Sequence, residues 1–360
     1  MQNLKALGLL VLLASSASAY PPANMGQAQA GAIEVRLVSD EPEAALSIIE
    51  KRKANVPITD SDWRRLFTCE GYIRLRKREA AMRRPLEEAD FKTFLLSDDV
   101  SARAGALAET LDKWKRADLA AAARRAMTYL PQAAQIHAKI YPEIKPAKNS
   151  FVFDVDTDPA IFLYIDPEVS REKFENTLAH ELHHIGYGST CPTKQAKDET
   201  GKLPQPAQVT LRWVGAFGEG FAMLAAAGGP DIHPHAVSEP EDRARWDRDM
   251  GNFNSDLRKV EGFFLEILAG KLKTQEAIGG AGSSFFGIQG PWYTVGWKMA
   301  VTIEETYGRT KLIECMCDQI KLLSTYNQAA TVYNRSAKEP LALWSPALLQ
   351  ALQGNQGAAK

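Results

Sequence analysis

The amino-acid sequence predicts an α+β fold that is predominantly helical and carries a small β-sheet. Long segments place apolar side chains three and four positions apart on a charged background, as one buried face of a helix requires. A few short runs are rich in β-branched and aromatic residues instead. Hydrophobic residues make up 45% of the 360 positions and charged residues 24%, so the chain can bury a sizeable core.

The charge balance gives no sign of a nucleic-acid partner. The 43 Lys and Arg side chains nearly cancel the 44 Asp and Glu side chains, which leaves a formal net charge of -1. Such a balance supplies neither a basic stripe for nucleic acid nor a strong field for an anionic membrane. The function must therefore be inferred from a specific site.

Residues 1–19 have the pattern of a secretory signal peptide. Lys5 precedes an apolar run over residues 6–13, and the small residues Ala17 and Ala19 stand where cleavage requires them. No later apolar run is long enough to span a bilayer, and no cysteine directly follows the cleavage region to carry a lipid anchor. We therefore expect a secreted or periplasmic protein without a membrane span.

Changes of composition divide the rest of the chain. The residues after the signal peptide are rich in Pro, Gly, Gln and Ala, which predicts disorder. Helical periodicity follows, and then a mixture of strands and helices. We expect a disordered lead at 20–32, a mostly helical region at 33–145, a mixed region at 146–330, and a C-terminal tail with a short helix at 331–360.

Strands are predicted at two places. Residues 33–37 alternate apolar and polar side chains, which indicates a short strand. The runs 150–156 and 160–166 are β-rich and are separated by turn-forming residues, so they predict a hairpin. The only histidine between these places, His137, lies on what reads as an apolar helical face, and we expect it to be packed.

The hairpin leads into a predicted helix. Ser170 can cap its start, and Gly186 and Gly188 are expected to end it. The polar stretch 189–206 has no hydrophobic period and predicts a surface loop, and the Gly-rich run 278–290 predicts another. Further helices are expected over residues 207–228, 239–272, 291–308 and 310–326.

Four cysteines are too few for a disulfide scaffold. Cys315 and Cys317 lie two positions apart in a helical pattern and point about 200° apart, so they should not bridge each other. Zinc-knuckle spacing is absent. We expect either buried thiols or one long-range disulfide that involves Cys69 or Cys191.

The run "LAHELHHIGY", residues 178–187, contains the pattern H-E-x-x-H at His180, Glu181 and His184. On a helix, two histidines four positions apart lie about 40° apart around the axis and can reach one ion. The intervening carboxylate can act as a general base on a metal-activated water. From the composition, only about 0.01 such patterns are expected by chance, which favours a metal site.

A catalytic zinc site needs a third protein ligand. Glu219 stands in the next helical segment among the small residues Gly215, Ala216, Gly218, Gly220 and Ala222, which let two helices approach closely. H-E-x-x-H followed by E-G-F-A resembles the gluzincin branch of zinc peptidases. The resemblance implies a zincin-like catalytic core within 146–330, made of a small β-sheet, an active-site helix and a glutamate helix.

The gluzincin resemblance also implies roles for individual residues. His180, His184 and Glu219 would bind Zn²⁺, and Glu181 would be the catalytic base. Tyr293, at the start of a helix after a Gly-rich loop, matches the tyrosine or histidine that stabilises the oxyanion in such enzymes, although packing beside Trp292 and Trp297 would explain it equally well.

The resemblance covers about residues 151–228, and it has departures. His184 and Glu219 are 35 positions apart, which is longer than in the best-known gluzincins, and the signature N-E-x-x-S-D is absent. The polar stretch after the histidine helix would absorb the extra length, because surface insertions cost little. The chain is therefore most similar to scattered bacterial families of secreted peptidases with a gluzincin-like core.

Other polar residues have less specific interpretations. His183 is expected to support the site from behind or to lie on the surface. His233 and His235 form an H-x-H pair that is expected in a plain loop, although either could be a rival ligand. Cys191 is close enough in sequence to be a remote alternative.

These features predict a secreted zinc-dependent peptidase that acts on peptides or proteins. The strand around 161–165 would lie at a sheet edge and pair with an extended substrate. Two alternatives remain: a non-peptidase zinc hydrolase built on the same site, and a non-catalytic secreted helical protein whose metal site is structural or vestigial.

Overall fold

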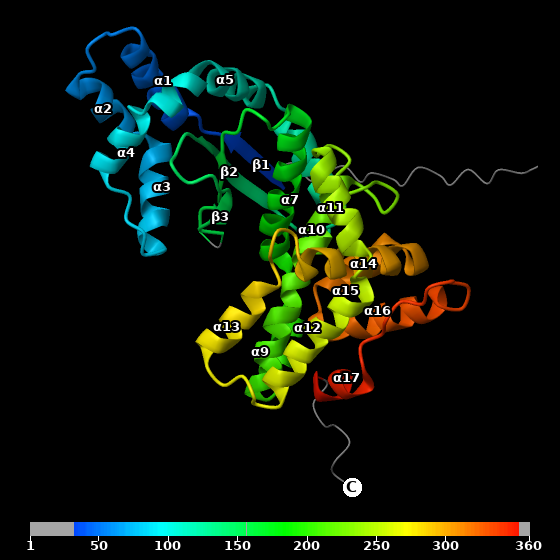
Figure 1. The fold of residues 1–360 in the computed structure, drawn as a ribbon. Coiled ribbons are helices and arrows are strands. Elements are labelled where there is room, and N and C mark those ends of the chain that lie inside the picture. The colour runs from blue at the N-terminus through cyan, green and yellow to red at the C-terminus, as the bar shows by residue number, and fades with distance from the viewer. Residues whose placement is uncertain (1–31, 156, 353–360) are drawn as a thin grey trace, which may run out of the picture.

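The computed structural model describes residues 32–155 and 157–352, and the structural statements below refer to these residues. The predicted signal peptide and nearly all of the predicted disordered lead lie outside them. The described chain is predominantly helical with one small mixed sheet, as the sequence predicts (Figure 1).

The sheet has the order β1 (Ile33–Leu37), β2 (Ile136–Glu143), β4 (Ala160–Tyr164) and β3 (Phe151–Phe153). The first three of these strands are parallel, and β3 pairs with β4 in the antiparallel sense. The predicted strand at residues 33–37 and the predicted hairpin are thereby confirmed. β2 is not among the predicted strands; only its first half alternates buried and less buried residues, and its second half is buried throughout.

Two expectations about this sheet are wrong. β4 is not at an edge, since β2 pairs with it on one side and β3 on the other. β3 takes the edge because the hairpin folds back outside β4. His137 is not packed on a helix but lies on β2, where its half-exposed side chain is 3.4 Å from a carboxylate oxygen of Glu34.

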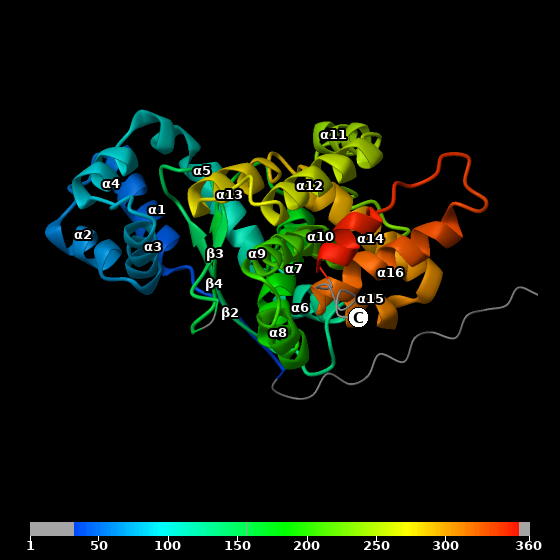
Figure 2. The same ribbon diagram turned by 90° about the horizontal axis from the view of Figure 1, so that it is seen from below.

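The two faces of the sheet differ in chemistry. One face presents apolar side chains of β1 and β2, such as Val35 and Ile140, and α6 (Leu119–Met127) and α7 (Arg171–Thr190) pack on this sheet. On the other face, Glu70 accepts hydrogen bonds from Arg36 at 3.1 Å and from the hydroxyl of Tyr141 at 2.8 Å. The sheet is thus enclosed between two groups of helices, as two perpendicular views show (Figures 1 and 2).

The N-terminal helices gather at one end of the molecule (Figure 2). The helices at this end are α1 (Asp40–Lys53), α2 (Asp60–Phe67), α3 (Glu70–Ala81), α4 (Glu88–Leu95) and α5 (Asp98–Lys115), whereas α6 packs beside α7 on the other side of the sheet. Polar side chains cap the first turn of two helices in the N-terminal half: Ser97 accepts from the amide of Val100 at the start of α5, and Asp118 accepts from the amide of Ala121 at the start of α6.

The remaining elements follow the histidine helix α7 and form the other end of the molecule (Figure 1). They are α8 (Lys194–Gly201), α9 (Gln205–Val214), the short 3₁₀ helix η1 (Gly215–Phe217), α10 (Gly218–Ala227), α11 (Pro240–Met250), α12 (Phe253–Leu268), α13 (Gln275–Ser284), α14 (Pro291–Tyr307), α15 (Arg309–Met316), α16 (Gln319–Tyr333) and α17 (Pro346–Leu352).

Three boundaries in this half differ from the predictions. The polar stretch 189–206 is not one loop but contains α8, whose first turn is capped by the Thr193 side chain. The Gly-rich run 278–290 is partly helical, because α13 extends into it and Gly282 packs against the Trp213 ring. α7 does not end at Gly186, since this glycine provides room for Leu130 and Ile136 inside the helix packing.

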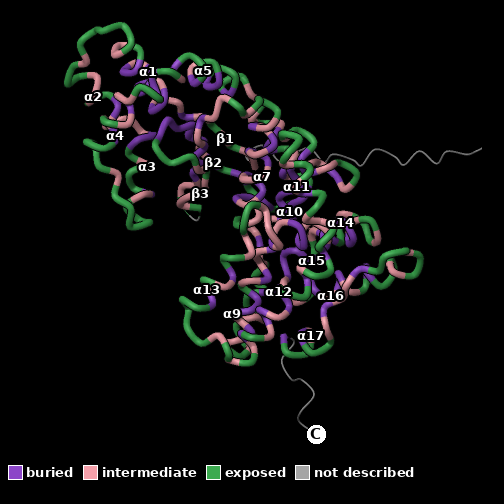
Figure 3. Tube along the Cα trace, in the orientation of Figure 1, coloured by how far each residue is buried: buried purple, intermediate pink, exposed green. Residues whose placement is uncertain are grey.

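A single hydrophobic core runs from the N-terminal helices to α17. Figure 3 shows its buried stretches along the crossing of α7, α10 and α14. A disulfide between Cys191 and Cys317 joins the end of α7 to the turn between α15 and α16, which confirms the expected long-range bridge. No helix within the described residues is both long enough and apolar enough to cross a bilayer.

Candidate metal centre

The histidines are held on a rigid helix. The Ser170 side chain accepts a hydrogen bond from the amide of Lys173 at 3.1 Å and so starts α7. Leu178 and Leu182 are fully buried and fix the rotation of the helix about its axis. This rotation leaves His180 and His184 on a half-buried face that turns toward α10.

Glu219 reaches that face because α10 is set unusually close to its neighbours. A β-carbon on Gly220 would overlap the backbone nitrogen of Trp297, and one on Gly296 would lie 2.6 Å from the carbonyl oxygen of Phe217. Only glycine at both positions lets α10 and α14 pack at this distance. The crossing positions the first turn of α10, which includes Glu219, against α7.

The three predicted ligands meet in a nearly equilateral triangle. The Nε2 atoms of His180 and His184 are 3.1 Å apart, and they lie 3.2 Å and 3.3 Å from one carboxylate oxygen of Glu219. Ligand atoms at about 2.05 Å from a tetrahedral zinc ion lie about 3.3 Å from each other. The donor set and its spacing therefore fit Zn²⁺.

The charges of the triangle favour a cation. Burial opposes ionisation of Glu219, but the two imidazoles outweigh it and hold the pKa of its carboxyl well below the ordinary value. Burial likewise opposes a charge on His184, but Glu219 raises the pKa of His184 to about 9. A positive charge on the imidazole pair is thus stabilised here, and a divalent cation would take the place of that proton.

Two further predicted residues adjoin the triangle. Glu181 follows His180 directly on α7 and is half-buried. The Tyr293 ring stacks at 6.3 Å from the His180 ring. Burial and the nearby Glu219 raise the pKa of the Tyr293 hydroxyl, so it stays protonated and can donate a hydrogen bond at neutral pH.

The rival ligands are elsewhere. His183 is buried on α7 beside His184, with the two ring centroids 6.4 Å apart, and burial lowers its pKa to about 3, so it stays neutral. Cys191 has no free thiolate, because it is bonded to Cys317. His233 lies 3.0 Å from Asp247, and it does not join the triangle.

Within residues 32–155 and 157–352, His180, His184 and Glu219 form the one group of three or more His, Cys, Asp or Glu side chains close enough to hold an ion. Sequence reasoning identified these residues but missed a polar cluster that flanks them. That cluster begins at Lys173, which lies seven positions before His180 and hence on the same helix face. This spacing is visible in the sequence.

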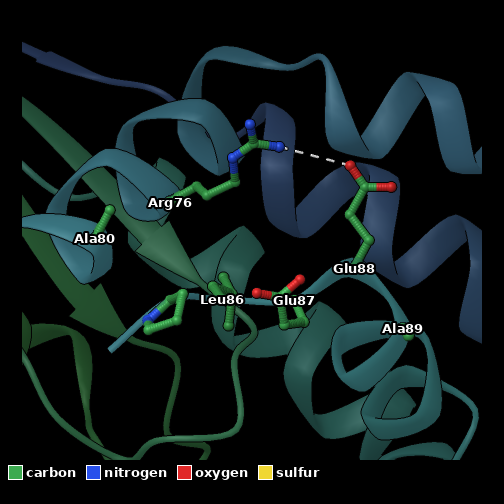
Figure 4. Close-up of a pocket in the computed structure, with 7 residues that line it drawn as sticks. Arg76, Ala80, Leu86, Glu87, Glu88 and Ala89 are labelled. Carbon is green, nitrogen blue, oxygen red and sulfur yellow. Dashed lines mark ion pairs between the residues drawn. The ribbon is translucent and has the colours of Figure 1, made fainter. Parts of the chain in front are cut away.

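A separate hollow of about 510 Å³ lies on the N-terminal helices, between α3 and the start of α4 (Figure 4). Arg76 and Glu88 face each other across it at 3.6 Å. Its lining includes Ala80, Pro85 and Leu86 but none of the predicted site residues. No residue of the metal triangle takes part in its lining.

Comparison with known sequences adds one match. The sequence model of a protein family, described as "Putative zinc dependent peptidase (DUF5700)", matches residues 63–334. No curated protein and no solved structure matches the chain. The matched range includes α7, α10 and α14, and therefore every residue of the metal triangle.

Proposed function

Since the chain belongs to the family described as "Putative zinc dependent peptidase (DUF5700)", we propose that it hydrolyses peptide bonds at the triangle of His180, His184 and Glu219. The observation that carries the proposal is the spacing of the three donor atoms, at 3.1–3.3 Å, which suits one tetrahedral zinc ion. Three protein ligands leave a coordination position for water or substrate, as catalytic zinc sites do.

A bound zinc ion supplies a Lewis acid that polarises the scissile carbonyl and makes water a nucleophile at neutral pH. Glu181 takes the proton from the attacking water and passes it to the leaving amine. Tyr293 donates a hydrogen bond to the carbonyl oxygen as negative charge develops on it. Both side chains adjoin His180, one along α7 and one by stacking.

The substrate is expected to bind as an extended strand. β3 is the edge of the sheet that follows β4 in the order, and its outer side is unpaired within the described residues. A peptide that adds to this edge would be held by main-chain hydrogen bonds, which suits a peptidase with varied substrates. Export by the predicted signal peptide would place the enzyme in the periplasm or outside the cell.

The proposal is tested by metal analysis and hydrolysis of a denatured protein. We expect about one equivalent of zinc in wild type and in Glu181→Gln, but activity only in wild type. Glu172→Gln is a matched control, because Glu172 is an exposed carboxylate on the same helix and should leave activity unchanged.

Other combinations of zinc content and hydrolysis would refute the zinc site or favour one of the two alternative functions. A wild-type protein without bound metal would refute the zinc site. Zinc with hydrolysis of small esters or amides but not of peptides would identify a non-peptidase hydrolase. Zinc without any hydrolysis would identify a structural or vestigial site.

A further inference from the structure

A second polar cluster includes a residue on the same face of α7 as the metal triangle. Lys173 on α7 donates a hydrogen bond from Nζ to Oγ of Ser238 at 2.6 Å. Oγ of Ser238 is in turn 3.0 Å from Nδ1 of His235. Ser238 and His235 belong to the segment between α10 and α11, which therefore folds back onto the N-terminal half of α7.

The hydrogen bonds of Lys173, Ser238 and His235 form a relay, in which each group has a defined donor or acceptor role. Because Ser238 accepts from the lysine, its own hydroxyl proton is free to point at Nδ1 of His235. The imidazole is neutral at pH 7, since burial and the positive charge of Lys173 lower its pKa to about 4. Its remaining proton is then on Nε2, which is buried and has no hydrogen-bond partner among the described residues.

Lys173 itself lacks a counter-ion. No carboxylate of the described chain lies within 4 Å of its ammonium group, although the side chain is half-buried. The nearby Asp242 is engaged by Arg245 at 2.5 Å. Burial lowers the pKa of Lys173, as expected for an ammonium group without a paired anion. A half-buried cation and a buried unpaired N–H group both call for an acceptor that carries negative charge.

The cluster is continuous with the metal centre. Lys173 and His180 are seven positions apart on α7, so they share one face and are separated by about 10 Å along the axis. Trp297 lies one helical turn beyond Tyr293 on α14 and packs at 5.9 Å from Trp246, whose ring is 5.3 Å from that of His235. The two tryptophans thus join the oxyanion side of the metal centre to the relay.

We propose that Lys173, held in place by Ser238 and His235, binds a carboxylate of the peptide substrate. This inference rests on the proposed function, because it assigns a substrate class to that same site. An extended peptide advances about 3.3 Å per residue, so the carboxylate would lie about three residues from the scissile bond. It can be a free C-terminus or the side chain of Asp or Glu. Lys173 contacts the substrate, and Ser238 and His235 are positioning residues.

The test measures binding rather than turnover. Glu181→Gln protein of known zinc content is titrated calorimetrically with N-acetylated hexaalanine as the free acid and as the amide. A second pair consists of amidated peptides with one central Glu or Gln. We expect one carboxylate peptide to bind at least about 10-fold more tightly than its neutral partner, since hydrogen bonds to charged groups are the strong ones. The pair that shows the preference identifies the source of the carboxylate.

Variants in the same background test the residues. Lys173→Met should abolish the preference and Lys173→Arg should keep most of it. His235→Phe should weaken the preference because the lysine loses its support, whereas Lys194→Met, which changes an exposed lysine on α8, should leave it unchanged. Circular dichroism and zinc content show whether each variant is folded.

Two results would overturn the proposal: no preference in either peptide pair, or a preference that survives Lys173→Met. A preference unaffected by His235→Phe would refute the positioning role of His235. Failure of the proposed function is seen separately, as absence of wild-type hydrolysis, and binding of the carboxylate peptides does not depend on that result.

Discussion

Gly220 of α10 and Trp297 of α14 approach so closely that no side chain fits between them: a β-carbon on the glycine would overlap the tryptophan's backbone nitrogen. The residue before this contact is Glu219, the carboxylate of the metal triangle. The position of the third ligand therefore depends on a helix crossing that lies outside the ligand set.

We expect Gly220→Ala to destabilise the protein by at least about 1–3 kcal/mol, the usual cost of forcing atoms into a packed core. It should also weaken zinc binding, because the displaced α10 carries Glu219 away from the histidines. Gly218→Ala is the matched control on the same helix, since a β-carbon there meets nothing within 4 Å. Denaturant unfolding and zinc titration check both variants. Equal stability and equal zinc affinity of the two variants would show that the crossing of α10 and α14 does not position Glu219.

The ion pair in the triangle predicts a pH dependence for the metal-free protein. The pKa of His184 is raised to about 9 in the folded chain, against about 6.5 when unfolded. Protonated His184 therefore stabilises the folded state fully below pH 6.5, and this contribution to the free energy of unfolding is lost as the pH rises toward 9. In Glu219→Gln the main cause of the shift is removed. The stability difference between wild type and Glu219→Gln, measured with a chelator present, should therefore shrink between pH 6.5 and 9; a constant difference would argue against the pair.

A buried carboxylate outside the metal triangle should limit stability at neutral and alkaline pH. Glu143, at the end of β2, is fully buried with no partner for either oxygen, and burial followed by the charge of Glu41 raises its pKa well above the ordinary value. In the unfolded chain this carboxyl ionises above about pH 4.5, whereas in the folded chain it stays protonated to higher pH. The free energy of unfolding therefore falls as the pH rises.

Glu143→Gln, which cannot ionise, should therefore raise the free energy of unfolding at pH 8 by about 1–3 kcal/mol and change it little at pH 4. Glu34→Gln on β1 is the control, because its carboxylate is exposed. A gain at pH 4 as large as the gain at pH 8 would show that shape, not charge, is responsible.

The disulfide between Cys191 and Cys317 closes a long loop, because the two cysteines are 126 positions apart in the sequence. Loop-closure entropy predicts a loss of about 4–5 kcal/mol when it is removed. We expect Cys317→Ser, or reduction of wild type, to lower the midpoint of chemical unfolding markedly. Reduction should have no further effect on Cys317→Ser; a further drop would mean that Cys69 or Cys315 also forms a bridge.

Much of the fold followed from local pattern. The hairpin before α7, the cap at Ser170, the stop at Gly228 and the start of α14 at Pro291 each rest on a few neighbouring residues, and the structure confirms them. β2 and α13 lack a clear local signal, and their conformations depend on the strands and rings that they meet in the folded chain. α8 has a local cap at Thr193, but the stretch around it has no hydrophobic period that would predict a helix.

The sequence by itself determined the pair of histidines, because their spacing of four residues on a helix leaves no freedom once the helix forms. It also proposed Glu219, but only the tertiary structure decided that this carboxylate meets the pair, through the glycine contacts between α10 and α14. The tertiary structure alone placed Lys173, Ser238 and His235 in one relay and moved the sheet edge from β4 to β3. The physical reason is distance along the chain: contacts within one helix are set by its geometry, whereas contacts between elements depend on how every intervening segment packs.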